Sequence, residues 1–183
     1  MKREEALNLL REKIQSNNLI KHCLAVEAVM GRLAEHFNGD KEKWVLAGLL
    51  HDIDYEQTKN DPQKHSLLGA EILQNYNFDS EIIEAVRAHN EVHGLARENK
   101  ISKALFCVDP MTGLIVAATL VLPDKKIEKL TPENVLNRYK EKSFAKGANR
   151  GTIASCQELG LSLEEFTAIS LKAMQNISGD LGL

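Results

Sequence analysis

The chain has 183 residues, of which 43% are apolar and 27% are charged, and its net charge is -3. This length suggests one domain, with room for a small extension, and the apolar share is enough for a core. The acidic balance excludes the basic surface of a nucleic-acid-binding protein, so we expect no large nucleic acid as a partner. A nucleotide substrate needs only a local group of lysines and arginines, which net charge does not exclude.

The three cysteines are far apart and form no CxxC pair, which favours reduced thiols in a cytoplasmic protein. The first residues, MKREEALNLLREK, are charged and periodic, unlike a signal peptide. The most apolar stretch, residues 101–122, is interrupted by a lysine, an aspartate and a proline. Its uninterrupted part is shorter than the roughly 20 residues that a bilayer needs, so we expect a buried helix and no membrane association.

Apolar residues recur at helical spacing along the first half of the chain. Residues 6–14 predict a first helix, and Asn17 or Asn18 is a candidate cap for a second, which runs to Phe37 and stops at Gly39. Asp40 is expected to cap a short third helix that ends near residue 51. Residues 54–63 are polar and predict a loop, and a fourth helix follows over about 64–76.

The second half of the chain continues the helical pattern. Asp79 or Ser80 is expected to cap a fifth helix ending near residue 90, and residues 101–122 predict a long helix bent near Pro110. Thr131 before a proline predicts a helix start, and Ser162 opens a capping box for the last helix. No run alternates like a strand, so we predict an all-α fold of about eight helices in a compact single-domain bundle.

The pair His51-Asp52 ends an apolar segment that should be entering the core. Imidazole nitrogen and carboxylate oxygen together suit Zn, Mn, Fe or Ni better than Ca or Mg. Neighbours on a helix point about 100° apart, so both side chains can reach one ion only if it lies beyond the helix end. Further ligands must then come from other helices.

Other polar residues stand where the pattern expects a helix interior or core, namely His22, His65, His89 and Asp109. Burying an unpaired charge is costly, and a shared cation would remove this cost for all of them at once. Each has an ordinary alternative: a hydrogen-bonded histidine, a surface residue at a helix start, or an aspartate that ends a helix before proline. The two remaining histidines have no such context, and we expect them to be solvated; they are His36 and His93.

The blocks GLLHDIDYE, HSLLGAEIL, AHNE and VDPMTGLI, in this order, resemble the HD-domain superfamily of metal-dependent phosphohydrolases, specifically small HDIG-type proteins. The resemblance covers residues 19–122, and it implies one HD domain over 1–183 with a core at about 19–122 and a helical extension at about 131–183. It implies metal ligands at His22, His51, Asp52 and Asp109, with His65 and His89 for a second ion. The expected cofactor is one or two divalent transition metals (Mn, Fe, Ni, Co or Zn), in a binuclear site.

The chain also departs from the resemblance. Asp54-Tyr55 stand where many HDIG proteins have glycine and lysine, and Asn90 replaces the second histidine of an HHE motif, which argues against a third metal. The GYP motif that accompanies cyclic dinucleotide chemistry is absent after Glu91.

The resemblance implies hydrolysis of a phosphoester of a nucleotide or other small phosphorylated metabolite by a metal-activated water. The candidate catalytic carboxylates are Asp52, Asp54 and Glu56; the last two are candidates for a base or a histidine orienter, with solvated loop acids as the alternative. Substrate phosphate needs cations, and the tail block KSFAKGANR resembles a compact HD subgroup. The candidate phosphate-binding residues are therefore Lys142, Lys146 and Arg150.

Two other functions stay open. The same ligand set resembles HD-type di-iron oxygenases, which two irons and oxygen consumption would distinguish from a hydrolase. A non-catalytic domain that binds a metal or nucleotide and regulates a partner is the third reading, which a single ion with a saturated ligand shell would favour. The sequence leaves a homodimer open.

Overall fold

The computed structural model describes residues 1–183 and contains helices and turns with no β-strand, so the prediction of an all-α fold is confirmed. The α-helices are α1 (Arg3–Lys13), α2 (Asn17–His36), α3 (Lys41–Leu50), α4 (Tyr55–Thr58), α5 (Leu67–Asn75), α6 (Ser80–Ala88), α7 (Lys100–Leu120), α8 (Pro132–Lys140), α9 (Arg150–Ala154), α10 (Leu163–Gln175) and α11 (Ser178–Leu181). Short 3-10 helices lie at η1 (Glu91–His93), η2 (Ile127–Lys129) and η3 (Ser155–Leu159).

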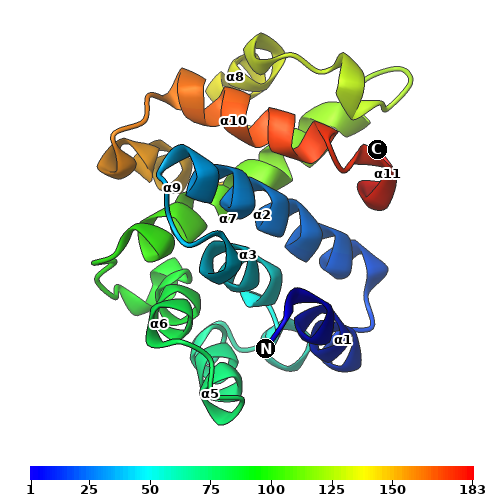
Figure 1. Cartoon of the computed structure of the whole chain (residues 1–183). Helices are drawn as coiled ribbons and strands as arrows, with labels where there is room; N and C mark the ends of the chain where they lie inside the picture. The colour runs from blue at the N-terminus through cyan, green and yellow to red at the C-terminus, as the bar shows by residue number, and fades with distance from the viewer.

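The long helix α2 lies across the middle of the molecule, with α10 along one side and α3 along the other (Figure 1). Its side chains at Val26, Met30 and Leu33 are fully buried, and so are Phe166 and Met174 of α10. One continuous core therefore joins α2, α3, α7 and α10. The division of the chain into a core at 19–122 and an extension at 131–183 stays a prediction.

Helix α7 is a core helix of this fold. By length and composition alone it would also pass as a membrane span, since its most apolar window has a mean hydropathy of 1.5. In the structure 67% of that window is buried inside the protein. The helix continues through Pro110, whose missing N–H removes one hydrogen bond of the helical ladder.

The predicted helix starts are confirmed at Asp40, Asp79, Thr131 and Ser162, each of which accepts a hydrogen bond from the first turn of its helix. Helix α2 is capped instead by the residue before the two asparagines, because the hydroxyl of Ser16 accepts the hydrogen bond of the Leu19 amide. Helix α4 lies within residues 54–63, where a loop was predicted, and α9 and α11 were not predicted.

Gly48 lies where α3 crosses α2. A Cβ at this position would be 2.9 Å from the Cα and 3.0 Å from the main-chain nitrogen of Glu27. We expect Gly48→Ala to push the two helices apart and to lower the free energy of unfolding by about 1–3 kcal/mol, despite the better helix propensity of alanine. Denaturant unfolding monitored by circular dichroism measures this change.

The matched control is Gly113→Ala in α7, because a Cβ there meets no atom within 4 Å. Only the change in helix propensity then matters, so the free energy of unfolding of this variant should rise by up to about 1 kcal/mol. A Gly48→Ala protein as stable as the unchanged protein would show that α2 and α3 are not packed this closely.

Candidate metal centre

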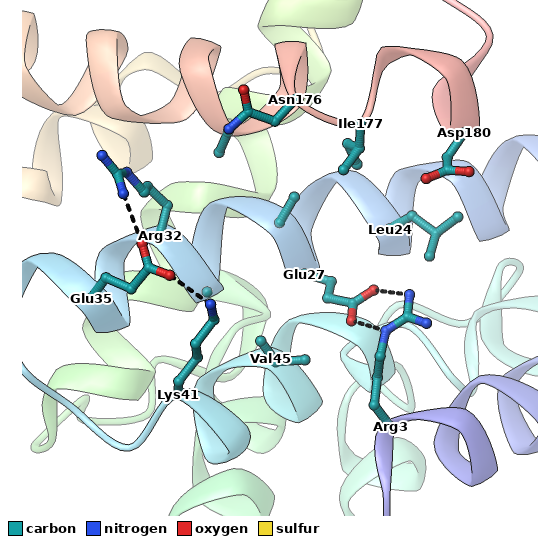
Figure 2. Close-up of a pocket in the computed structure, with 13 residues that line it drawn as sticks. Arg3, Leu24, Glu27, Arg32, Glu35, Lys41, Val45, Asn176, Ile177 and Asp180 are labelled. Carbon is teal, nitrogen blue, oxygen red and sulfur yellow. Dashed lines mark hydrogen bonds and ion pairs between the residues drawn. The ribbon is translucent and has the colours of Figure 1, made fainter.

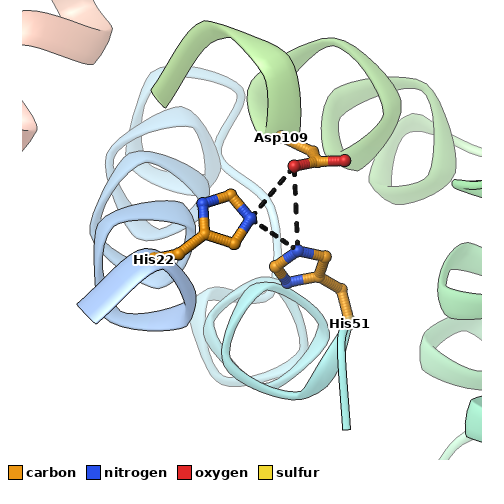
Figure 3. Close-up of side chains that lie close together, drawn as sticks. All are labelled: His22, His51 and Asp109. Atoms are coloured by element: carbon orange, nitrogen blue, oxygen red, sulfur yellow. Dashed lines mark hydrogen bonds and ion pairs between the residues drawn. The ribbon is translucent and has the colours of Figure 1, made fainter. Parts of the chain in front are cut away.

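Residues from five separate segments meet beside the N-terminal half of α2. His22 lies in the second turn of α2, His51 caps the C-terminus of α3, and Asp109 lies in α7. Figure 3 shows these three side chains pointing toward one another from their three helices. The His22 Nε2 atom is 3.0 Å from Asp109 Oδ1 and 3.2 Å from His51 Nε2, and His51 Nε2 is 3.9 Å from Asp109 Oδ1. We call this group the first half-site.

A second group lies directly beside the first. His65, in the turn before α5, and His89, at the C-terminus of α6, bring their Nε2 atoms to 3.2 Å. Asp52 Oδ1 is 3.4 Å from His65 Nε2 and 3.6 Å from His89 Nε2. Its other oxygen, Oδ2, is 3.7 Å from His22 Nε2 and 3.5 Å from His51 Nε2. The Asp52 carboxylate therefore lies between the first half-site and this second half-site, with one oxygen toward each.

The Nε2 atoms of the four imidazoles face the cluster, and each ring is oriented by the contact that its Nδ1 atom makes. In each ring Nδ1 faces an acceptor, so Nδ1 carries the proton and Nε2 presents a lone pair to the cluster. The acceptors are the Gly48 carbonyl for His51 (2.8 Å), the Val86 carbonyl for His89 (2.6 Å), the Asp54 carboxylate for His65 (3.1 Å) and the Thr112 hydroxyl for His22 (3.3 Å). Lone pairs facing one another at 3.2 Å require a proton or a cation between them. This donor set fits divalent transition metals, for which metal-bound histidines hold their second nitrogen in the same way.

The electrostatics of the cluster favour positive charge. Burial raises the pKa of the Asp52 carboxyl, but the electrostatic interaction with His51 and the hydrogen bond with His89 outweigh this effect, so the pKa lies far below its usual range. Burial likewise raises the pKa of Asp109, and the hydrogen bond from His22 reverses this shift. Both carboxylates are therefore ionised, as metal ligands must be.

The pKa values of the histidines are likewise set by burial on one side and by the neighbouring carboxylates on the other. Burial lowers the pKa of His51, and the negative charge of Asp52 does not fully offset this effect. Burial also lowers the pKa of His22 and His89, but a hydrogen bond with Asp109 or Asp52 outweighs it, so both pKa values are raised. A proton on either ring occupies the position that a cation would take, so metal binding should release protons.

Asp54 lies beside the His65 ring and hydrogen-bonds it. The residue is fully buried, and its Oδ1 accepts the hydrogen bond from His65 Nδ1 while its Oδ2 accepts those from the Ser66 and Gly69 amides at 2.8 and 3.0 Å. Glu56 is placed elsewhere, which corrects the expectation that it serves the site. Its Oε1 accepts hydrogen bonds from the amides of Gln15 and Ser16, both at 2.7 Å, and so joins α4 to the start of α2.

Several residues outside the predicted set support the site. His93, which we expected to be solvated, is partly buried and donates from Nε2 to the His65 carbonyl at 2.8 Å. The Asn90 amide donates to the carbonyls of Pro62 and His65 at 2.9 and 3.2 Å. The only sequence signal for this role was their position within four residues after His89, Asn90 in the block AHNE and His93 just beyond it.

The three predicted phosphate-binding residues are placed differently from one another. Lys146 lines a hollow together with His22 and Asp109. Lys142 is exposed and lines neither of the hollows beside the cluster. Arg150 directs its guanidinium to main-chain carbonyls of its own segment, which leaves no donor for a phosphate and corrects its expected role.

Two hollows open onto the cluster. One, of about 190 Å³, is lined by His65, His89 and Asp109, and the other, of about 290 Å³, by His22 and Asp109. Asp109 and Pro110 border both hollows, so the two openings adjoin over the two half-sites. A small molecule can therefore approach the ligand atoms from outside.

A larger hollow, of about 520 Å³, lies elsewhere, between α2, α3 and the C-terminal helices. Its lining residues on α2 lie about half a turn around the helix from His22. Arg3 donates twice to Glu27, at 2.6 and 2.9 Å, and Glu35 pairs with both Arg32 and Lys41 (Figure 2). Apart from Asp180, its charges are thus paired among themselves, and no group of metal-holding side chains lies there.

These observations define an all-α protein with clustered histidines and aspartates. Two overlapping groups of these side chains could hold metal ions, one of His22, His51 and Asp109 and one of His51, Asp52 and His89. Residues 19–111 match the HD domain family, and the chain therefore belongs to that family. The match spans every candidate ligand from His22 to Asp109.

Similar proteins bear the name Ribonuclease Y. The chain is 28% identical over 138 residues to that of Lawsonia intracellularis, covering 74% of this chain and 26% of the relative. It is 32% identical over 139 residues to that of Clostridium tetani, covering 73% of this chain and 26% of the relative. The chain thus spans about a quarter of the length of these relatives. No solved structure matches the chain.

Proposed function

We propose that this protein is a metal-dependent phosphohydrolase that acts on a small phosphorylated metabolite, such as a nucleotide. The observation that carries the proposal is the Asp52 carboxylate, which lies between two groups of inward-facing Nε2 atoms. Family membership supports the hydrolase class. The relatives' name points to the same bond type, because a ribonuclease breaks a P–O bond.

The chain's own residues prepare the site for this reaction. A pair of divalent cations, when bound, supplies a water of lowered pKa and neutralises charge on the phosphoryl oxygens. His22, His51, Asp109 and one Asp52 oxygen would hold one cation, and His65, His89 and the other Asp52 oxygen would hold the second. The second set has fewer protein ligands, so it leaves more positions for water and substrate.

The substrate would enter where the two hollows adjoin. Lys146 lines the opening beside His22 and can place its ammonium against a phosphoryl oxygen. Asp109 keeps 34% of its side chain exposed there, whereas the His51 side chain is fully buried. The phosphoryl group is therefore expected at the Asp109 side of the cluster.

Metal removal tests the proposal. Protein purified without chelator should contain up to two transition-metal ions per chain and should release phosphate from several small phosphoesters. Dialysis against a chelator should remove both the metal and the activity, and the activity should return when the metal is restored. Elemental analysis followed by a phosphatase screen of common metabolites measures both.

Other outcomes of the same experiment would contradict the proposal. Two irons with oxygen consumption and no phosphate release would favour an HD-type oxygenase. One ion with a closed ligand shell and no turnover would favour a structural or regulatory metal.

A further inference from the structure

We propose that residues 141–149, which we call the 141–149 loop, select the substrate of this site, and that Arg150 is the positioning residue that fixes the loop. This inference rests on the proposed phosphohydrolase function. The substrate class that the loop admits is a compact phosphate monoester with a hydroxylated leaving group, such as a sugar phosphate or a nucleoside monophosphate. An extended RNA strand is excluded.

The Arg150 guanidinium organises the loop from its centre. An arginine side chain has five N–H donors, and here all its partners are main-chain carbonyls. They are those of Tyr139 from Nε (3.0 Å), Ala145 and Ala148 from Nη1 (3.1 and 2.5 Å), and Arg138, Glu141 and Phe144 from Nη2 (3.2, 3.2 and 2.6 Å). The loop is therefore folded around one cation, and lysine could not replace it because an ammonium has only three donors.

The loop forms the outer wall of both openings. Ala145 and Lys146 line the hollow beside His22, and Asn149 lines the one beside His65 and His89. Gly147 lines both hollows. The position of this one loop therefore sets the width of both entrances.

A second contact ties the far end of the loop to the site. Glu91 follows His89 by two residues, and its Oε2 accepts hydrogen bonds from the Asn149 amide at 3.0 Å and the Thr152 hydroxyl at 3.3 Å. The loop is thus held at its centre by Arg150 and at its end by Glu91. A wall fixed at two points keeps its shape when substrate binds.

The lining defines the substrate class. Lys146 is the only lysine or arginine that lines either hollow, and the two adjoining hollows, of about 190 and 290 Å³, lie at the small end of the range for ligand pockets. A polynucleotide needs a row of cations along its backbone. The opening beside His89 is instead lined by uncharged polar side chains and by Glu91, whose Oε2 is hydrogen-bonded to Asn149 and Thr152 while its Oε1 has no partner. A carboxylate oxygen of this kind suits a sugar hydroxyl, which donates a hydrogen bond.

The reaction is a simple hydrolysis. The water oxygen forms a bond to phosphorus, the bond from phosphorus to the sugar oxygen breaks, and the proton of the water passes to that oxygen. No oxidant or reductant is needed.

Gly147→Phe tests the role of the loop in the metal-loaded protein. A Cβ at Gly147 meets no atom within 4 Å, and its φ is not positive, so the substitution adds bulk at the entrances without backbone strain. We expect kcat/KM for glucose phosphate and adenosine monophosphate to fall about tenfold or more, with unchanged metal content. The matched control is Gly179→Phe in α11, where a Cβ also meets nothing; its kcat/KM should stay within about twofold.

Arg150→Gln and Arg150→Lys test the positioning residue. Both should raise KM for glucose phosphate while kcat for p-nitrophenyl phosphate, which needs no sugar contacts, changes less. Both variants should retain their metal content, and the KM of Arg150→Lys should be raised as much as that of Arg150→Gln.

Three results would overturn the inference. One is an unchanged kcat/KM for glucose phosphate in Gly147→Phe, and a second is cleavage of a single-stranded RNA oligonucleotide by the unchanged protein as readily as glucose phosphate. In both, hydrolysis of p-nitrophenyl phosphate by the unchanged protein would leave the proposed function standing. The third result is that no phosphoester is hydrolysed in a metal-dependent way, which would overturn both this inference and the proposed function.

Discussion

Asp52→Ala should abolish both metal binding and phosphoester hydrolysis. The Asp52 carboxylate places one oxygen toward each half-site, so alanine removes a ligand from both at once. The second half-site would then have no carboxylate, and the first would keep only that of Asp109. We expect a loss of at least about 4 kcal/mol of transition-state stabilisation, roughly a thousandfold in kcat/KM. Elemental analysis and a p-nitrophenyl phosphate assay measure the two effects.

The control for Asp52 is Asp61→Ala, which removes another carboxylate at the surface, where Asp61 pairs only with Lys64. Its metal content and activity should match those of the unchanged protein. Activity that survives in Asp52→Ala would show that the cluster is not the reaction centre, and the proposed function would fail with it.

Asp54→Ala should reduce stability and selectively weaken the second half-site. The substitution leaves three buried donors without an acceptor: the amides of Ser66 and Gly69 and the His65 ring nitrogen. We expect the free energy of unfolding to fall by about 3 kcal/mol. The His65 ring also loses its orientation, so affinity for a cation at that half-site should fall about 10–100-fold. Denaturant unfolding and metal titration measure these two losses.

Glu56→Ala is the matched control for Asp54, because Glu56 also accepts two main-chain amides but faces away from the cluster. It should lose at most about 1 kcal/mol of stability and bind metal normally. Asp54→Asn keeps one acceptor oxygen, so its stability and metal affinity should lie between those of Asp54→Ala and Glu56→Ala. Equal metal affinity in Asp54→Ala and Glu56→Ala would remove Asp54 from the role of orienter.

Much of the fold follows from local chemistry that the sequence displays. Asp40, Asp79, Thr131 and Ser162 were predicted as caps because their side chains accept hydrogen bonds from the first turn of a helix, a short-range interaction. The convergence of the six candidate ligands was predicted from their shared polarity at core positions together with the family resemblance.

The start of α5 shows where local reasoning failed. The pattern of HSLLGAEIL predicted a helix from about residue 64, but α5 begins at Leu67. Ser66 has a φ of 72°, a left-handed value that a helix does not allow, and its amide is bound by Asp54. A contact twelve residues away in the chain thus overrides helix propensity and turns His65 toward the cluster.

Arg150 and Glu56 show a second limit of sequence reasoning. Charge, together with the resemblance of the tail block for Arg150 and the place just after His51-Asp52 for Glu56, predicted a phosphate ligand and a catalytic acid. Each side chain instead binds main-chain groups. Which partner a charged side chain finds depends on how loops fold, and composition does not specify loop conformation. His93 is the reverse case, since only the fold brings it to the His65 carbonyl.

The two half-sites rest on supports of unequal stiffness. His22, His51 and Asp109 project from α2, α3 and α7, which are packed in the core. His65 stands in a turn that Asp54, Asn90 and His93 hold by a few hydrogen bonds. Local opening of that turn costs far less than unfolding the core, so an ion in the second half-site should exchange with solvent faster than an ion in the first. The supply of that labile ion in the surroundings would then govern how much of the protein is competent at any moment.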